Sequence, residues 1–240
     1  MGRYPAGVKA DPAGERPAAP LLAVPDRETY FARWSALHGG LDPYGSRWIL
    51  GWLSLTYRVA RPLALRRIPP DALTATGPVF GGAVVGATLA GGRWPLLAVI
   101  VVVLSGLMDS LDGAVAALRG MARPWGTVLD SLADRCTDLL YLTALWVSGA
   151  PGWLCVAAGG LTLLQESSRA TAAAAGMVGI GVITVWERPS RVILLAFAMA
   201  AVGAAQGWAG QIATVAAAVA FGLAVAGCVQ LLRAAYLRLR

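Results

Sequence analysis

The stretch DSLDGAVAALRGMARPWGTVLDSLAD, residues 109–134, decides the fold, because it places carboxylates at the adjoining ends of two apolar segments. Asp109 and Asp112 are three residues apart, and Asp130 and Asp134 are four apart, so each pair lies on one face of a helix. The linker between the pairs is short. We therefore expect two antiparallel neighbouring helices on which all four carboxylates converge.

Four carboxylates that converge in an apolar environment repel one another unless protons or cations neutralise them. A single aspartate of this kind would equally suit a proton relay or an ion pair with Arg135 or Arg169, but four at this spacing favour a metal site. Ligation by oxygen alone is typical of Mg²⁺ or Mn²⁺ rather than zinc. The predicted ligands, for a site that holds two ions, are Asp109, Asp112, Asp130 and Asp134.

Composition indicates that these segments lie in a bilayer. Of the 240 residues, 57% are hydrophobic and only 14% are charged, and the mean hydropathy is +0.62. The net charge of +7 is almost wholly arginine, which favours anionic lipids or phosphate ligands. No basic stripe with interleaved aromatic residues suggests nucleic-acid binding. The three cysteines lack the spacing of a zinc site or a disulfide framework.

The chain divides into a tail and a membrane domain. Residues 1–44 are rich in Pro, Ala and Gly and predict a loose cytoplasmic tail with one helix-like piece at about 26–37. Residues 48–68 mix apolar side chains with arginines, as interfacial amphipathic helices do. The domain, 45–240, is predicted to be all-α and integral to the membrane, with six spans at about 72–91, 94–117, 126–148, 152–176, 190–207 and 211–232.

Arginines set the predicted orientation, because cytoplasmic loops are enriched in Lys and Arg. They precede the first span and follow the second, fourth and sixth, whereas the alternate loops hold only Arg93. We therefore expect a multi-pass protein of the plasma membrane with both termini and the 119–125 loop in the cytoplasm.

The order and spacing of the stretch resemble the signature of the CDP-alcohol phosphotransferase family, from Asp109 through Gly113, Ala116 and Gly126 to Asp134. The six spans after an amphipathic helix resemble that family as well. One departure is that the family places arginine directly after the alanine, where this chain has Ala117.

The resemblance implies a transferase of phospholipid synthesis in which CDP-diacylglycerol, or a related CDP-alcohol, donates a phosphatidyl group to an acceptor hydroxyl and CMP leaves. It also implies a homodimer. Asp134 would deprotonate the hydroxyl. The glycines at 113 and 126 suit either a close ligand or a close helix. The residues implied in nucleotide and donor binding are Asp112, Gly113, Ala116, Gly126 and, in place of the missing arginine, Arg123.

The acceptor region rests on Arg169, Arg188 and Arg191. Their surroundings resemble the actinobacterial phosphatidylinositol-phosphate synthase and phosphatidylglycerophosphate synthase branch of the family, although Thr171 stands where that branch has arginine. The resemblance implies a phosphorylated polyol such as inositol phosphate or glycerol phosphate, which guanidinium groups can bind through paired hydrogen bonds. Anchoring to lipid headgroups is the alternative role.

Two other classes fit parts of the pattern. A membrane transporter would use the carboxylates to couple ions, although no internal repeat is visible in the sequence and the aspartates lie toward one end of their spans. A non-catalytic lipid-binding relative is suggested by Ala117 and Thr171.

Overall fold

The structure, a computed structural model, describes residues 24–37, 40–177 and 183–240. Every regular element in this part of the chain is helical, as the sequence predicts. Two short 3₁₀ turns, Pro43–Gly45 and Gln206–Trp208, accompany the α-helices, which are α1 (Arg27–Leu37), α2 (Arg47–Leu65), α3 (Pro70–Thr74), α4 (Thr76–Ala90), α5 (Trp94–Arg119), α6 (Pro124–Val147), α7 (Gly152–Ala174), α8 (Arg188–Ala204) and α9 (Ala209–Leu239).

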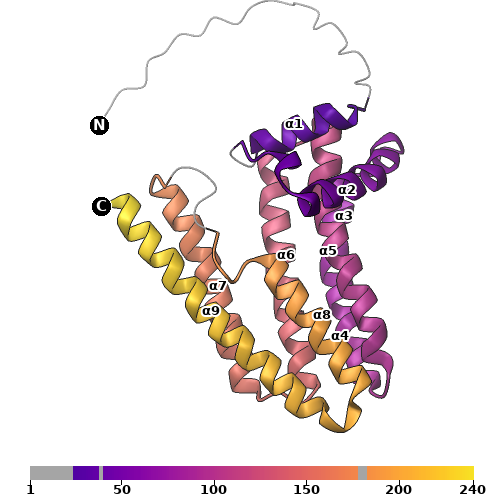
Figure 1. Cartoon of the computed structure of the whole chain (residues 1–240), viewed down its shortest axis with the longest axis vertical. Helices are drawn as coiled ribbons and strands as arrows, with labels where there is room; N and C mark the ends of the chain where they lie inside the picture. Colours follow the sequence, from indigo (N-terminus) through magenta and orange to yellow (C-terminus); the bar gives the residue numbers. More distant parts are fainter. Residues whose placement is uncertain (1–23, 38–39, 178–182) are drawn as a thin grey trace, which may run out of the picture.

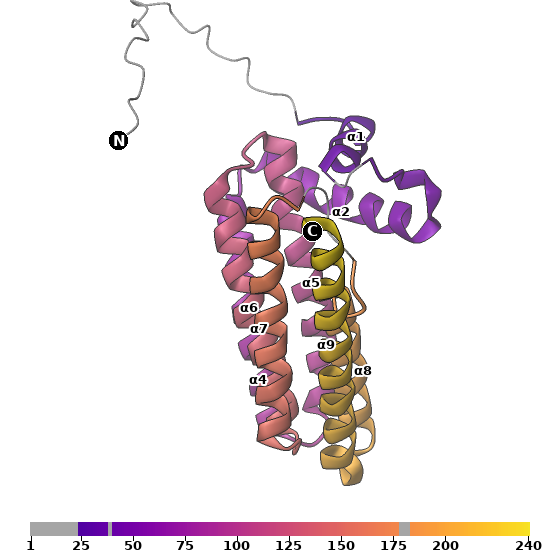
Figure 2. The same ribbon diagram turned by 90° about the vertical axis from the view of Figure 1, so that its left-hand side faces the viewer.

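The long helices α4 to α9 run alternately up and down in one elongated bundle, and α1 and α2 lie across one end of it (Figure 1). The turned view shows the same arrangement, with the C-terminus at the end that carries α1 and α2 (Figure 2). The α5–α6 turn also lies at this end, whereas α8 begins farther along the bundle (Figure 1).

The helices follow the predicted spans closely, with two differences. The first predicted span consists of α3 and α4, which meet at Ala75, and the last helix continues past 232 to Leu239. By length and composition alone, three helical segments within the described residues are apolar enough to cross a membrane, and they are Pro70–Ala90, Trp94–Arg119 and Gln206–Leu239. Helices α6, α7 and α8 contain polar and charged residues that lower their apolar character.

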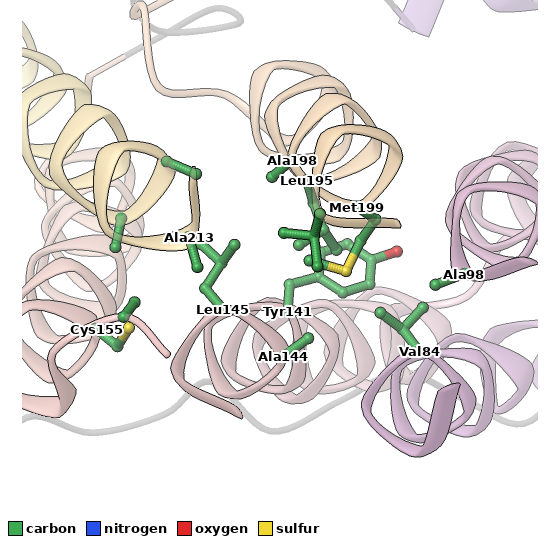
Figure 3. Close-up of a cluster of buried hydrophobic side chains, with 14 of the residues drawn as sticks. Val84, Ala98, Tyr141, Ala144, Leu145, Cys155, Leu195, Ala198, Met199 and Ala213 are labelled. Carbon is green, nitrogen blue, oxygen red and sulfur yellow. The ribbon is translucent and has the colours of Figure 1, made fainter. Parts of the chain in front are cut away.

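Small side chains let the helices approach closely in the core of the bundle (Figure 3). Val84, Ala98, Ala144 and Met199, from four different helices, are fully buried in one cluster. A Cβ added at Gly203 would lie only 2.9 Å from the backbone nitrogen of Leu96, so α8 packs directly on α5. This contact fixes the position of α8 relative to the carboxylates of α5.

The predicted tail contains a helix that is part of the packed structure. Tyr30 and Phe31 of α1 are buried against Leu53 of α2 and Leu111 of α5. Packing therefore begins before position 45, because two aromatic side chains fix α1 onto the bundle end. The predicted loose character of residues 1–23 lies outside the described residues.

Candidate active site

Three of the four signature carboxylates come together at the end of the bundle that carries α1 and α2. Oxygen atoms of Asp109, Asp130 and Asp134 lie within 4.8 Å of one another. Gly120 permits the turn between α5 and α6, because it ends α5 in the left-handed region at φ 63°. Contrary to expectation, α5 and α6 make little direct contact, because α4 packs against both helices. The separation leaves space between the carboxylate-bearing faces.

Asp112 is not among these three close carboxylates. Its Oδ2 accepts a hydrogen bond from the Thr74 hydroxyl at 2.6 Å, and the side chain is buried. The carboxylate still borders the same cavity as Asp130. Its neighbourhood therefore suits either a second ion or a donor group that displaces the Thr74 contact.

A guanidinium group lies among the three carboxylates. Arg188 Nε is 3.1 Å from Asp109 Oδ2, and Arg188 Nη1 is 2.5 Å from Asp134 Oδ1. These are ion pairs without hydrogen-bond alignment, and both nitrogens lack an aligned acceptor among the described residues. Arg188 therefore offsets part of the negative charge of the carboxylates. Their oxygen atoms fit a divalent metal ion.

A cavity of about 560 Å³ opens beside the cluster and is lined by signature residues, including Asp112, Gly113, Ala116, Gly126 and Asp130. A Cβ at Gly113 would meet nothing within 4 Å, and one at Gly126 would meet only a side-chain carbon of Arg123 at 3.9 Å. The two glycines therefore leave the cavity open for a ligand, whereas close helix packing does not require them.

The predicted donor-binding Arg123 also lines this cavity. Its Nη2 is 2.6 Å from Asp71 Oδ2, and both side chains are partly exposed. Asp71 therefore already offsets the charge of this guanidinium.

Arg169 lies on α7 and contacts two acidic side chains. Its Nη2 is 2.6 Å from Glu187 Oε1, and its Nε is 3.7 Å from Glu166 Oε2. Burial acts to raise the pKa of Glu187, but hydrogen bonds from Thr184 and the pairing with Arg169 outweigh it, so this pKa lies below its usual value. Glu187 consequently stays ionised beside Arg169.

Arg191 is buried behind these residues, at 6% exposure. Its Nη1 donates to Asp138 and its Nη2 to Glu166, both at 2.6 Å. The predicted acceptor contact of Arg191 stays a prediction; in this structure its Nη1 and Nη2 are paired with these two carboxylates. Sequence reasoning missed Glu166, although its position three residues before Arg169 on a helix is a signal for pairing.

Taken together, these features define a helical protein with a carboxylate cluster that could hold a metal ion, beside a cavity of about 560 Å³. A family model described as CDP-alcohol phosphatidyltransferase matches residues 67–238. The chain belongs to the CDP-alcohol phosphatidyltransferase family, and it is an enzyme of this type.

Individual relatives agree. The chain is 31% identical to an archaetidylinositol phosphate synthase of Aeropyrum pernix, over 58% of this chain and 73% of that protein. It is 29% identical to a phosphatidylinositol phosphate synthase of Cutibacterium acnes, over 65% of this chain and 77% of that protein.

Solved structures show a similar fold. The Mycobacterium tuberculosis phosphatidylinositol phosphate synthase with CDP-DAG bound has a TM-score of 0.60 and 24% identity, over 76% of this chain and 94% of that chain. The same enzyme in complex with manganese and citrate has a TM-score of 0.61 and 24% identity, over 75% and 88%.

Proposed function

We propose that the chain transfers a phosphatidyl group from CDP-diacylglycerol to the hydroxyl of a phosphorylated polyol, with release of CMP. The observation that carries this proposal is the convergence of Asp109, Asp130 and Asp134 beside a cavity lined by Asp112 and Gly113. Relatives named as synthases of inositol-phosphate lipids, and a structural neighbour with CDP-DAG bound, support the same donor and acceptor classes.

In the proposed reaction, the acceptor oxygen attacks the phosphorus of the phosphatidyl group. A new P–O bond forms, and the P–O bond to CMP breaks, with CMP keeping the electron pair. Asp134 is the proposed base that takes the hydroxyl proton, which requires hydrogen-bond reach to that group. Gly113, Ala116 and Gly126 leave room for the cytidine.

Asp109, Asp130 and Asp134, with Asp112 once the donor displaces its Thr74 contact, would hold Mg²⁺ or Mn²⁺. When bound, such ions neutralise the diphosphate and stabilise charge on the leaving CMP. The proposal is supported by the oxygen-only ligand set and by the manganese complex of the structural neighbour.

Arg188 and Arg169 are the proposed partners of the acceptor phosphate. Arg188 lies closest to the proposed base, paired with Asp109 and Asp134. When metal ions take those carboxylates, its guanidinium can donate to phosphate oxygens. Arg169 is paired with both Glu166 and Glu187. Arg191 would keep Glu166 in place and so orient Arg169.

An acceptor panel tests this assignment. Purified protein with CDP-diacylglycerol and Mg²⁺ or Mn²⁺ should release CMP faster with inositol phosphate or glycerol phosphate than with inositol or glycerol. CMP release is followed by chromatography, and the lipid product by mass spectrometry. Equal or faster turnover with the unphosphorylated alcohols would contradict a phosphate-binding acceptor site.

We further propose six membrane spans, with the site at the cytoplasmic face and α2 along the membrane surface. The position of the α5–α6 turn and the C-terminus toward the same end of the bundle supports this topology (Figure 1). The α5–α6 turn and the C-terminal end carry Arg119, Arg123, Arg233, Arg238 and Arg240. A homodimer is part of the same proposal, and chemical crosslinking in membranes would test it.

Site-directed labelling tests the topology. In a variant without the three native cysteines, Arg123→Cys should react with an impermeant maleimide only after the cells are permeabilised. Arg93→Cys, in the turn at the opposite end of the bundle, should react in intact cells and serves as the control. Labelling of Arg123→Cys from outside would reverse the proposed orientation.

A further inference from the structure

An arginine from outside the signature borders the donor cavity. Arg33 lies on α1, before the matched range 67–238, yet its side chain lines the cavity together with Asp112 and Gly113. Its Nη1 donates a hydrogen bond of 2.8 Å to the carbonyl oxygen of Ala117 on α5. The N-terminal helix therefore forms one wall of a site that is otherwise built from α3, α5 and α6.

Among the described residues that line this cavity, Arg33 carries the positive charge that is not paired with a carboxylate. Of the two guanidinium groups among the cavity-lining residues, that of Arg123 pairs with Asp71 at 2.6 Å. Arg33 bonds to a neutral carbonyl, and no carboxylate of the described residues lies within ion-pair distance of it. An anionic group in the cavity would thus gain more from Arg33 than from Arg123.

The helix that carries Arg33 is fixed in place before any ligand binds. Tyr30 and Phe31 are 3% and 2% exposed. The ring of Tyr30 packs on that of Tyr57 of α2, with 5.7 Å between their centroids, and the Tyr57 hydroxyl donates to the carbonyl of Pro25. This packing fixes the helix that carries Arg33, and the exposed Arg33 side chain is itself positioned by its bond to the Ala117 carbonyl. A group positioned in advance loses less conformational entropy when it binds phosphate.

We propose that Arg33 binds the diphosphate of the CDP-linked donor, which makes α1 part of the donor site. This inference rests on the proposed function. Arg33 contacts residue 117, the position at which the signature has arginine and this chain has alanine. A cation from α1 therefore compensates, in space, for one that is absent from α5. Guanidinium groups suit this task because they stay charged and bind phosphate oxygens in pairs.

The test compares Arg33→Gln with wild type in detergent micelles free of anionic lipid. Glutamine keeps an N–H donor for the Ala117 carbonyl but removes the charge. CDP affinity, measured by isothermal titration calorimetry, should fall by about 10- to 100-fold, as expected for loss of a hydrogen bond between charged groups. CMP affinity should fall less, the donor KM should rise, and the acceptor KM should stay unchanged.

Arg27→Gln is the matched control, because Arg27 lies on the same helix but places its guanidinium over the Phe31 ring, 5.0 Å from the centroid. It should leave CDP affinity within about twofold of wild type, the usual range for an exposed substitution. The double variant Arg33→Gln with Ala117→Arg should regain CDP affinity, because it returns a guanidinium to the same space.

Unchanged CDP affinity and donor KM in Arg33→Gln would overturn the proposal. So would an equal loss in Arg27→Gln, which would indicate that α1 acts only through packing. An altered dependence of activity on anionic lipid, with normal CDP affinity, would assign Arg33 to a lipid headgroup and also overturn it. A wild-type protein that binds CDP but never releases CMP from the donor would refute the proposed function and leave the Arg33 comparison valid.

Discussion

Replacing Asp130 by asparagine should lower kcat for CMP release by at least about a hundredfold, the size of effect seen when one electrostatic group is removed from an active site. The change keeps the size of the side chain and removes one negative charge from the cluster with Asp109 and Asp134. The measurement is steady-state CMP release at saturating donor and acceptor, over a range of Mg²⁺ or Mn²⁺ concentrations.

The matched control is Asp42→Asn, the same chemical change at an exposed carboxylate. Asp42 caps the 3₁₀ turn Pro43–Gly45, and asparagine caps as well as aspartate. This variant should keep wild-type activity. Thermal unfolding in detergent checks that both variants fold. Normal turnover of a folded Asp130→Asn variant would exclude a metal role for this carboxylate.

Replacing Arg188 by alanine should reduce kcat/KM for a phosphorylated acceptor by about 10- to 100-fold, as loss of a hydrogen bond between charged groups does. Arg188 is the arginine nearest the proposed base, with 2.5 Å between its Nη1 and Asp134 Oδ1. Turnover of an unphosphorylated alcohol should change less, so the preference between the two acceptors should collapse. Kinetics with both acceptors at saturating metal measure this.

Arg188→Lys separates charge from shape. Lysine keeps the positive charge but cannot bind phosphate through a planar pair of donors, so it should restore only part of the acceptor preference. Arg93→Ala, at the opposite end of the bundle, should behave as wild type. An Arg188→Ala variant that keeps its preference for the phosphorylated acceptor would remove Arg188 from the acceptor site.

Most helices could be predicted from hydropathy alone, because each of them coincides with a long apolar stretch of the sequence. The helices α5, α6 and α7 begin and end within two residues of the predicted spans. The break at Ala75 and the extension of α9 to Leu239 were not predicted. Local backbone geometry and the packing of neighbouring helices decide such ends, and apolar composition does not specify them.

The signature residues could be assigned to one site because their spacing sets the helix face on which they lie. The structure brings Asp109, Asp130 and Asp134 together, and it places Gly113 and Gly126 on the open cavity. Their chemical roles stay predictions until they are tested by substitution.

Two contacts at the site could not be predicted, because their partners come from distant parts of the chain. Asp138 and Arg191 are 53 residues apart, and Arg33 and Ala117 are 84 apart. No local period relates such residues, and only the folded bundle brings them into contact. The carboxylates that pair with Arg191, Asp138 and Glu166, were likewise not evident from the sequence.

Metal-dependent CMP release tests whether the protein transfers a phosphatidyl group with metal ions held by its aspartates. Purified wild-type protein is incubated with CDP-diacylglycerol and an inositol phosphate or glycerol phosphate acceptor, with Mg²⁺ or Mn²⁺ or with excess chelator, and CMP and the lipid product are quantified. We expect equal amounts of CMP and phospholipid with metal, none with chelator, and recovery when metal is restored. Turnover that persists in chelator, or no CMP under any metal and acceptor, would contradict this expectation.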